Sequence, residues 1–514
     1  MKHWKQGLLS VAATLTMAAP ALAQAPVNVT VTVDTSKAGP RIEPAIYGQF
    51  AEHLGRGIYE GVWVGPDSKI PNTNGYRNDV LAALKHIKVP VVRWPGGCFA
   101  DEYDWRDGIG PKAKRPVRIN RHWGGVTEDN QFGTHEFMNY SEMLGTDAYV
   151  AGNMGSMGPR DMSQWVEYMT AEKGTLAEQR KANGREKPWV VKYFGVGNET
   201  WGCGGSMRPE YSADLHRRYA EFVNAPAGKP KIVKVASGAN ASDYNFTDVM
   251  MREAGNRMNA LSVHYYTLPT GKWDKKGAAT GFGEDEWAST LGRAIFMDEL
   301  VSKHAAMMDK HDPEKRVGLY VDEWGTWYDQ ESGSVPGFLY QQNSLRDAEV
   351  AALTLNIFHR HTDRVKMANI AQMVNVLQAM ILTDKGRMVL TPTYHVFDMY
   401  VPFQGATPYE ADVKGPNYER AGFKVPMVDV SAARGTDGKL YLSLTNTDPN
   451  KPARVTTNLS GNARGRILTG PAIDTHNTFD KPNTIMPAPY AAQSKGGKLS
   501  FDLPAKSVVV VAVE

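Results

Sequence analysis

The sequence predicts an α/β protein, a (β/α)8 TIM barrel followed by an antiparallel, jelly-roll-like β-sandwich. Eight short apolar runs alternate with helical segments between residues 45 and 392. After residue 392 the pattern changes to short strands separated by turns rich in Gly, Asn and Pro. With 514 residues, the chain is long enough to form more than one hydrophobic core.

The eight apolar runs have the length and composition of buried strands. They are AIYGQF (45–50), VPVVRW (89–94), DAYVAGN (147–153), VVKYFGVGN (190–198), KIVKVASG (231–238), ALSVHYY (260–266), RVGLYVDEW (316–324) and VKMANIAQ (365–372). Near-continuous apolar strands that alternate with helices indicate a parallel sheet covered on both faces. Eight such units fit a closed barrel. A doubly wound open sheet is the alternative, but no Gly-rich nucleotide fingerprint follows the first run.

Between these runs lie segments in which apolar residues recur with helical spacing. Clear examples are 78–87, 212–224 and 347–359. The repeated order of strand and helix supports the barrel.

The C-terminal part reads as a β-sandwich because several short strands follow one another at close spacing. The strands are expected within 424–435, 439–450, 453–461, 463–470 and 498–514. The run VNVTVTVDTS (27–36) precedes the barrel, and we expect it to join this sandwich. The predicted divisions are 1–23, 24–44 for the N-terminal strand, 45–392 for the barrel and 393–514 for the sandwich.

The first 23 residues resemble a secretory signal peptide. Lys2 and Lys5 precede an apolar stretch, and Ala21-Leu22-Ala23 forms a small-x-small cleavage site. Loss of this segment would lower the net charge from +3 to +1, too little to indicate a nucleic-acid partner. No later segment is apolar enough to predict a membrane span. The expectation is an exported protein, periplasmic or extracellular.

The chain contains only two cysteines, Cys98 and Cys203. Both lie in Gly-rich loops that follow apolar runs, so they can form one disulfide or remain separate. Two cysteines alone are weak evidence for a metal site, and no metal or organic cofactor is expected.

Two carboxylates lie at the C-terminal ends of predicted strands, where barrel enzymes have their catalytic residues. Glu199 directly follows the fourth run and Glu323 lies at the end of the seventh, and a Trp follows each within two residues. Glycoside hydrolysis requires one protonated and one ionised carboxyl group, and proximity pushes their pKa values apart. We therefore predict Glu199 as acid/base and Glu323 as nucleophile. A single Glu at such a position is more often a surface or salt-bridge residue.

Several longer motifs now resemble glycoside hydrolase family 51, which consists mainly of α-L-arabinofuranosidases. The motifs are GVGNETWGCGG (195–205), YVDEWGTWY (320–328), IYGQFAEHLGRGIYEGVW (46–63), VVRWPGGCFADEYDWRDGIGP (91–111), SVHYYT (262–267) and NIAQMVN (369–375). They occur in family order between about residues 45 and 392. The furanose substrate and the retaining mechanism are implied by this resemblance.

The resemblance also implies roles for individual residues. Glu199 matches the acid/base and Glu323 the nucleophile. Asn198 matches the residue that bonds the sugar 2-hydroxyl, while Glu52 matches a carboxylate that binds other hydroxyls. The further implied binding residues are Arg93, Cys98, His264, Tyr266, Trp324, Trp327 and Gln372.

Each binding residue also has a structural reading. His264 could be a satisfied core histidine, Arg93 a buried ion-pair partner, Glu52 a helix-start carboxylate, and the tryptophans core residues. Cys98 stands where some family members have Asn, and a thiol is a weaker donor to a sugar hydroxyl.

The expected activity is exo-acting release of terminal arabinofuranose from oligosaccharides or polysaccharides such as arabinan, arabinoxylan or arabinogalactan. Rival readings are another retaining glycosidase on the same barrel, acting on β-xylosides, galactofuranosides or β-glucans, and a catalytically dead carbohydrate-binding protein. The resemblance also implies a homo-oligomer, with hexamers common in the family.

Overall fold

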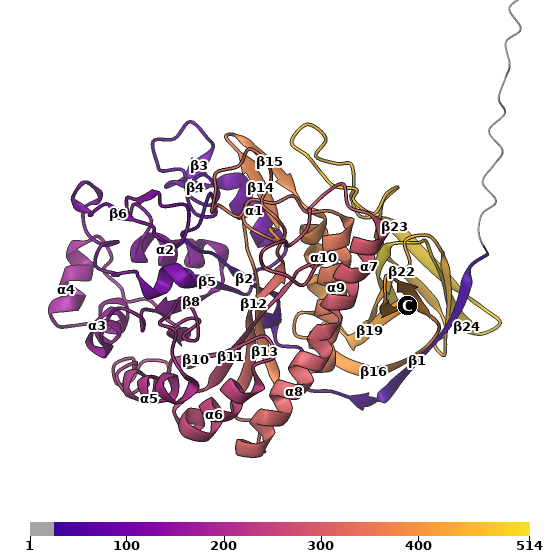
Figure 1. The fold of residues 1–514 in the computed structure, drawn as a ribbon, viewed down its shortest axis with the longest axis horizontal. Helices are drawn as coiled ribbons and strands as arrows, with labels where there is room; N and C mark the ends of the chain where they lie inside the picture. The colour runs from indigo at the N-terminus through magenta and orange to yellow at the C-terminus, as the bar shows by residue number, and fades with distance from the viewer. Residues whose placement is uncertain (1–24) are drawn as a thin grey trace, which may run out of the picture.

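The computed structural model describes residues 25–514, which form an eight-stranded parallel barrel and a nine-stranded closed sheet. In Figure 1 the barrel lies at the left and centre, and the C-terminal sheet lies at the right. The predicted signal peptide, residues 1–23, lies outside the described residues. The predicted fold class is confirmed.

Each of the eight apolar runs supplies one barrel strand. The strands are β2 (Gly48–Phe50), β5 (Val91–Trp94), β8 (Asp147–Gly152), β9 (Tyr193–Val196), β10 (Val233–Asn240), β11 (Ala260–Thr267), β12 (Gly318–Thr326) and β13 (Val365–Ile370). They pair in this order, and β13 closes the sheet by pairing with β2. Their C-terminal ends therefore share one face of the barrel.

The helices surround the barrel, which explains why its strands are apolar on both faces. They are α1 (Asn78–His86), α2 (Thr134–Leu144), α3 (Pro159–Thr170), α4 (Thr175–Ala182), α5 (Pro209–Ala220), α6 (Tyr244–Ala254), α7 (Glu284–Ala294), α8 (Phe296–His311), α9 (Leu345–Arg360) and α10 (Pro392–Tyr400).

The C-terminal part forms a single closed sheet rather than two separate ones. Its strands are β1 (Val27–Ala38), β16 (Thr407–Lys414), β19 (Val428–Arg434), β20 (Leu440–Asn446), β21 (Ala453–Thr457), β22 (Asn462–Thr469), β23 (Ala488–Lys495), β24 (Lys498–Leu503) and β25 (Ser507–Val513). The neighbours are antiparallel except for β1 and β21, which pair in parallel.

The first strand of the described chain belongs to the last part of the fold. β1 pairs with β16 on one side and with β21 on the other, and Figure 1 shows it beside the C-terminal strands. Its Val29, Val31 and Val33 face the core of this sheet. α10 begins at residue 392 and packs against α9, so we propose that the barrel part extends to Tyr400.

Short two-stranded hairpins lie outside the two main sheets. They are β3–β4 (Asn72–Thr73 and Tyr76–Arg77), β6–β7 (Arg118–Ile119 and Thr127–Glu128), β14–β15 (Ile381–Asp384 and Arg387–Leu390) and β17–β18 (Asn417–Arg420 and Phe423–Pro426). Among residues 25–514, none of the helices combines the length and apolar character that a bilayer crossing requires.

Candidate active site

Glu199 lies on a tight loop that begins where β9 ends. Gly197 has φ +84° and Glu199 itself has φ +38°, which is unusual for a residue with a side chain. A Cβ atom at Gly197 would also approach Met154 to 2.9 Å. Such strained backbone occurs where the surrounding structure holds it in place, often at functional sites.

Two attachments hold this loop against the turn formed by Cys98–Asp101. The buried carboxylate of Asp101 accepts hydrogen bonds from the backbone N–H groups of Asn198, Met154 and Gly155, at 3.0, 2.7 and 2.8 Å. Cys98 and Cys203 are joined by a disulfide. The direction of the Glu199 side chain is therefore fixed from both ends of the turn.

Glu323 reaches the same space from β12 through a β-bulge. Ser262 and His264 of β11 face Tyr320 and Glu323, so β12 has one extra residue between these pairs. The bulge lets both Asp322 and Glu323 contact groups at the barrel mouth. Their ion pairs with Arg93 and His264 lie there.

Glu323 accepts two hydrogen bonds, one at each carboxylate oxygen. Arg93 donates to Oε1 at 2.8 Å, and the Tyr266 hydroxyl donates to Oε2 at 2.8 Å. Arg93 also donates to the side-chain oxygen of Asn198 at 2.5 Å. One buried guanidinium thus aligns the loop after β9 and the strand β12, which carry the two carboxyl groups.

His264 connects Glu199 to Asp322. Its Nδ1 lies 2.8 Å from Glu199 Oε1, and its Nε2 lies 3.1 Å from Asp322 Oδ1. Burial acts to lower the pKa of His264, but the charge of Glu323, the hydrogen bonds to Asp322 and Glu199 and the charge of Asp322 raise it to about 10. The ring is therefore an imidazolium at neutral pH and donates to both carboxyl groups.

The two glutamates have different electrostatic surroundings. Burial raises the pKa of Glu199, and the nearby charge of Glu323 raises it further, while the hydrogen bond from His264 opposes both effects. Glu323 has the direct ion pair with Arg93. The site can therefore hold Glu199 protonated beside the Arg93–Glu323 ion pair.

A third carboxyl group, Glu52, lies just beyond the end of β2. Its Oε1 accepts from the backbone N–H groups of Gly97 and Phe99 and from the Trp123 indole, at 3.0, 3.1 and 2.9 Å. Gln372 donates to its Oε2 at 3.2 Å. Burial and the charge of Glu323 raise its pKa to about 7, so near neutral pH it can bind hydroxyl groups in either protonation state.

The candidate residues surround one cavity of about 740 Å³. Eight of the sequence-predicted site residues line it: Glu52, Cys98, Glu199, His264, Tyr266, Glu323, Trp327 and Gln372. Arg93 and Asn198 are buried behind the cavity wall and contact each other.

The prediction that Trp324 binds sugar is wrong. Its side chain is 1% exposed and packs edge-on against Phe358 and parallel to Phe397. Successive side chains of a strand point to opposite faces, so Trp324 points outward because Glu323 points inward. Trp327 instead forms an aromatic wall of the cavity with Tyr266 and Trp273.

Cys98 lines the cavity, but as part of a disulfide it has no thiol hydrogen to donate to a sugar. The implied role as a hydroxyl-binding thiol therefore does not fit this form of the protein.

Sequence reasoning missed several residues that complete the site. Asp322 and Tyr149 meet through a 2.7 Å hydrogen bond below His264, and their positions read as ordinary strand interior. Trp123, which holds Glu52, lies in a polar connection without a strand signal. Trp273, 55% exposed, belongs to the long β11–α7 connection. The length of this connection suggests that it shapes the cleft, but does not indicate which of its residues lines the cavity.

The close approach of two carboxyl groups at the mouth of a parallel barrel indicates the class of protein. One oxygen of Glu199 and one of Glu323 lie within 4.8 Å of each other. Retaining glycosidases place their carboxyl groups about 5–5.5 Å apart, whereas inverting enzymes leave about 6.5–9.5 Å for a water. A parallel barrel with this pair at its C-terminal mouth is the architecture of a glycoside hydrolase.

Comparisons with known proteins narrow this class. Residues 83–279 match the family model of the alpha-L-arabinofuranosidase 1 domain, and 322–507 match that of the alpha-L-arabinofuranosidase C-terminal domain. A Bacteroides ovatus protein named intracellular exo-alpha-L-arabinofuranosidase is 50% identical over 508 residues, covering 98% of each chain.

Solved structures agree with the sequence relatives. The GH51 arabinofuranosidase from Xanthomonas axonopodis pv. citri matches with a TM-score of 0.93 and 55% identity, over 95% of this chain and 100% of the other. The Thermotoga maritima alpha-L-arabinofuranosidase, in an arabinose complex, matches with a TM-score of 0.83 and 29% identity over the same shares. The chain belongs to glycoside hydrolase family 51, the family of α-L-arabinofuranosidases.

The comparisons contradict the predicted localisation. The Bacteroides ovatus relative, which matches 98% of the chain, is named intracellular, so the expectation of a periplasmic or extracellular protein is wrong. That expectation used Lys2 and Lys5, the apolar run after them and the small-x-small site at Ala21-Leu22-Ala23, and this local pattern does not by itself determine the compartment.

Proposed function

We propose that this protein is an exo-acting α-L-arabinofuranosidase that releases terminal arabinofuranose by double displacement. The observation that carries the proposal is the close pair of carboxyl groups in unlike surroundings. Glu323, paired with Arg93, is the nucleophile. Glu199, whose pKa is raised by burial and by Glu323, is the acid/base.

In the first step, a Glu323 oxygen attacks the anomeric carbon while the Glu199 proton passes to the departing glycosidic oxygen. Covalent bonding removes the charge of Glu323, and with it a cause of the raised pKa of Glu199. Glu199 is then ionised and accepts a proton from water, which attacks the glycosyl–enzyme bond. Because the anomeric carbon is inverted twice, the configuration of the sugar is retained.

The remaining residues bind and orient the sugar. Glu52 and Gln372 offer polar groups to the hydroxyls, and Trp327 offers an apolar face. The bond from Asn198 to the 2-hydroxyl stays a prediction from the family resemblance, because Asn198 lies behind the cavity wall. Tyr266 and Arg93 hold the nucleophile, and His264 holds the acid/base.

The cavity supports a substrate longer than one sugar. Its volume of about 740 Å³ suits a drug-sized ligand and exceeds a single pentose. Trp201, Tyr265 and Phe296 also line it, and this further wall can accommodate the sugar chain that carries the terminal arabinose. We therefore propose arabinose-containing oligosaccharides or polysaccharides as substrates. The homo-oligomer, a hexamer by resemblance, stays a prediction.

Initial rates on aryl glycosides test this proposal: α-L-arabinofuranoside, β-D-xyloside, β-D-galactofuranoside and β-D-glucoside. We expect turnover of the arabinofuranoside alone. Glu323→Ala should lose it by roughly 10²-fold or more, and azide should restore turnover to Glu199→Ala by replacing the water that this variant cannot activate.

Asp312→Asn is a matched control, because Asp312 is a buried carboxylate paired with Arg364 away from the cavity. Faster turnover of another glycoside would contradict arabinofuranose as the substrate. If the folded protein turned over none of the glycosides, the alternative of a catalytically dead carbohydrate-binding protein would be favoured. Full activity of either glutamate variant would reject the mechanism.

A further inference from the structure

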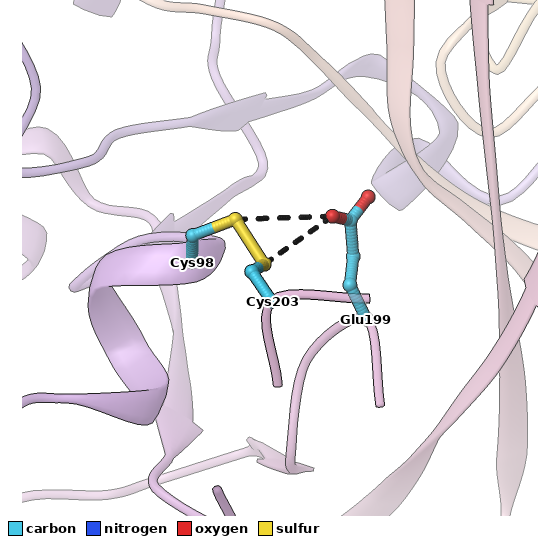
Figure 2. A group of neighbouring side chains, drawn as sticks. All are labelled: Cys98, Glu199 and Cys203. Carbon is cyan, nitrogen blue, oxygen red and sulfur yellow. Dashed lines mark hydrogen bonds between the residues drawn. A yellow bond between two sulfur atoms is a disulfide. The ribbon is translucent and has the colours of Figure 1, made fainter. Parts of the chain in front are cut away.

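Three groups that bind metal ions in other proteins converge beside the cavity. Cys98, Cys203 and Glu199 each offer one ligand atom, and these atoms lie within 4.8 Å of one another. Figure 2 shows the two sulfur atoms facing the same carboxylate oxygen, with Cys98 on its short helix and Cys203 on the loop that follows Glu199. The chain has no other cysteine.

The Glu199 carboxylate presents its free oxygen to the sulfurs. His264 contacts Oε1 at 2.8 Å, whereas Oε2 lies 3.5 Å from Cys203 Sγ and 3.9 Å from Cys98 Sγ. Sulfur atoms in a disulfide have no hydrogen and no thiolate charge. In this form the contacts are therefore neither hydrogen bonds nor metal-binding groups.

Reduction would change the chemistry of these atoms while the backbone keeps them together. Asp101 holds the start of the loop through the Asn198 N–H independently of the disulfide, and the two Cα atoms lie 5.5 Å apart. Two thiolates and a carboxylate suit zinc and softer divalent cations. Because Cys98 and Glu199 line the cavity, a cation between them would face an open position.

We propose that reduction of the Cys98–Cys203 disulfide creates a binding site for a thiophilic divalent cation, Zn²⁺ or Cd²⁺. The ligands are the two thiolates and Glu199 Oε2, and a water or substrate oxygen fills the fourth position. A phosphine reductant breaks the S–S bond and becomes a phosphine oxide with oxygen from water, while each sulfur gains a proton. The cation then displaces both thiol protons to solvent.

Cation binding at this site inhibits the enzyme. This consequence rests on the proposed role of Glu199, because the cation occupies the oxygen that lies free of His264 and replaces its proton. The reduced enzyme would thus be sensitive to zinc or cadmium and the disulfide form resistant.

The test uses the full chain without an affinity tag, reduced with a phosphine, desalted without oxygen and titrated with Cd²⁺ alone. We expect uptake of a single Cd²⁺ per chain with ultraviolet absorbance from the thiolate–cadmium bonds. Turnover of the aryl arabinofuranoside should fall by roughly 10²-fold and recover when a chelator is added. Circular dichroism checks that the reduced protein stays folded.

Three comparisons isolate the site. The oxidised protein should show no thiolate–cadmium absorbance at the same Cd²⁺ concentration, and its turnover should not change when Cd²⁺ is added. Cys203→Ser keeps the Cys98 thiol, so it should bind Cd²⁺ at least about tenfold more weakly, with less absorbance and weaker inhibition. Glu199→Gln should keep the absorbance, because both thiolates remain. It should bind Cd²⁺ at least about tenfold more weakly, because even the loss of a group that only supports a metal ligand lowers metal affinity by that factor.

The outcomes separate this proposal from the proposed function. No Cd²⁺ uptake by folded, reduced protein would overturn the site, as would equal inhibition of the oxidised form. Binding with the expected absorbance but without inhibition would support the site and contradict the role of Glu199.

Discussion

Asp322 is a residue whose importance appears only in the folded site. It accepts hydrogen bonds from Tyr149 and His264, and the positive charges of Arg93 and His264 keep its pKa low against the opposing effect of burial. Its charge in turn helps to keep His264 protonated. Asp322 therefore acts through His264 on the hydrogen bond to Glu199.

We expect Asp322→Asn to lower the pKa of His264 from about 10, because the variant keeps the size of the side chain and removes the charge. We expect kcat/KM to fall by roughly tenfold, because a less protonated ring holds Glu199 less firmly. The NMR titration of His264 and initial rates measure these two effects. An unchanged His264 titration in Asp322→Asn, or the same shift in the control Asp312→Asn, would contradict the role of Asp322.

The individual site residues differed in how well the sequence predicted them. Glu199 and Glu323 stand at the ends of apolar strands, where position alone suggests chemistry. The prediction for Trp324 was wrong because it treated both tryptophans of one motif as sugar-binding. Trp324 follows Glu323 on the strand, and successive side chains of a strand point to opposite faces. Asp322 was missed because the β-bulge that turns it inward depends on the register between β11 and β12, which no local pattern reports.

At the scale of elements, α9 joins the two parts of the molecule. All of its residues except Arg360 are buried, because the helix packs against the barrel strand β12 and against β19, β20 and β25 of the C-terminal sheet. Its helical spacing was readable from the sequence, which predicted 347–359. Its burial on two sides was not readable from the sequence, because the strands that cover the second side lie far along the chain.

The same burial leaves Glu349 of α9 with neither side-chain oxygen hydrogen-bonded within the described chain. Burial raises its pKa well above 4.5, Lys506 opposes the shift and Asp448 adds to it. As the pH rises above 4.5, the unfolded chain loses this proton while the folded protein keeps it. The contribution of Glu349 to the free energy of unfolding is therefore fully present below pH 4.5. It declines as the pH rises, by up to about 1.4 kcal/mol per pH unit.

Glu349→Gln should remove this dependence, because an amide of the same shape does not titrate. We expect its free energy of unfolding to approach that of the wild type near pH 4.5 and to exceed it increasingly toward pH 8. Urea unfolding at several pH values measures the difference. A constant difference across this range would contradict a protonated Glu349 in the folded protein.

At the scale of the whole molecule, the eight strands of the barrel were predictable because each is a local apolar run. The C-terminal β-rich part was predictable for the same reason. Its closure into one sheet was not, because β1 bridges β16 and β21 across most of the chain length. Strand pairing at such separations depends on tertiary packing, which local propensity does not determine.

Because β1 closes this sheet, a charge on its buried face should destabilise the whole C-terminal part. Val31 is fully buried, whereas the neighbouring Thr30 is exposed. Val31→Asp should lower the free energy of unfolding by about 3 kcal/mol or more, and Thr30→Asp should change it by less than about 0.5 kcal/mol. Thermal and urea unfolding measure both, and equal effects of the two substitutions would contradict the inward face of β1.

The position of β1 also has a consequence for synthesis on the ribosome. Asp34 pairs with Glu410, which is made 376 residues later. At about 5–20 residues per second, β1 waits roughly 20 to 75 s for its first partner while the barrel can already fold. An unpaired strand is a site for association with other chains, so the interval before β16 emerges is when the nascent protein most needs a chaperone.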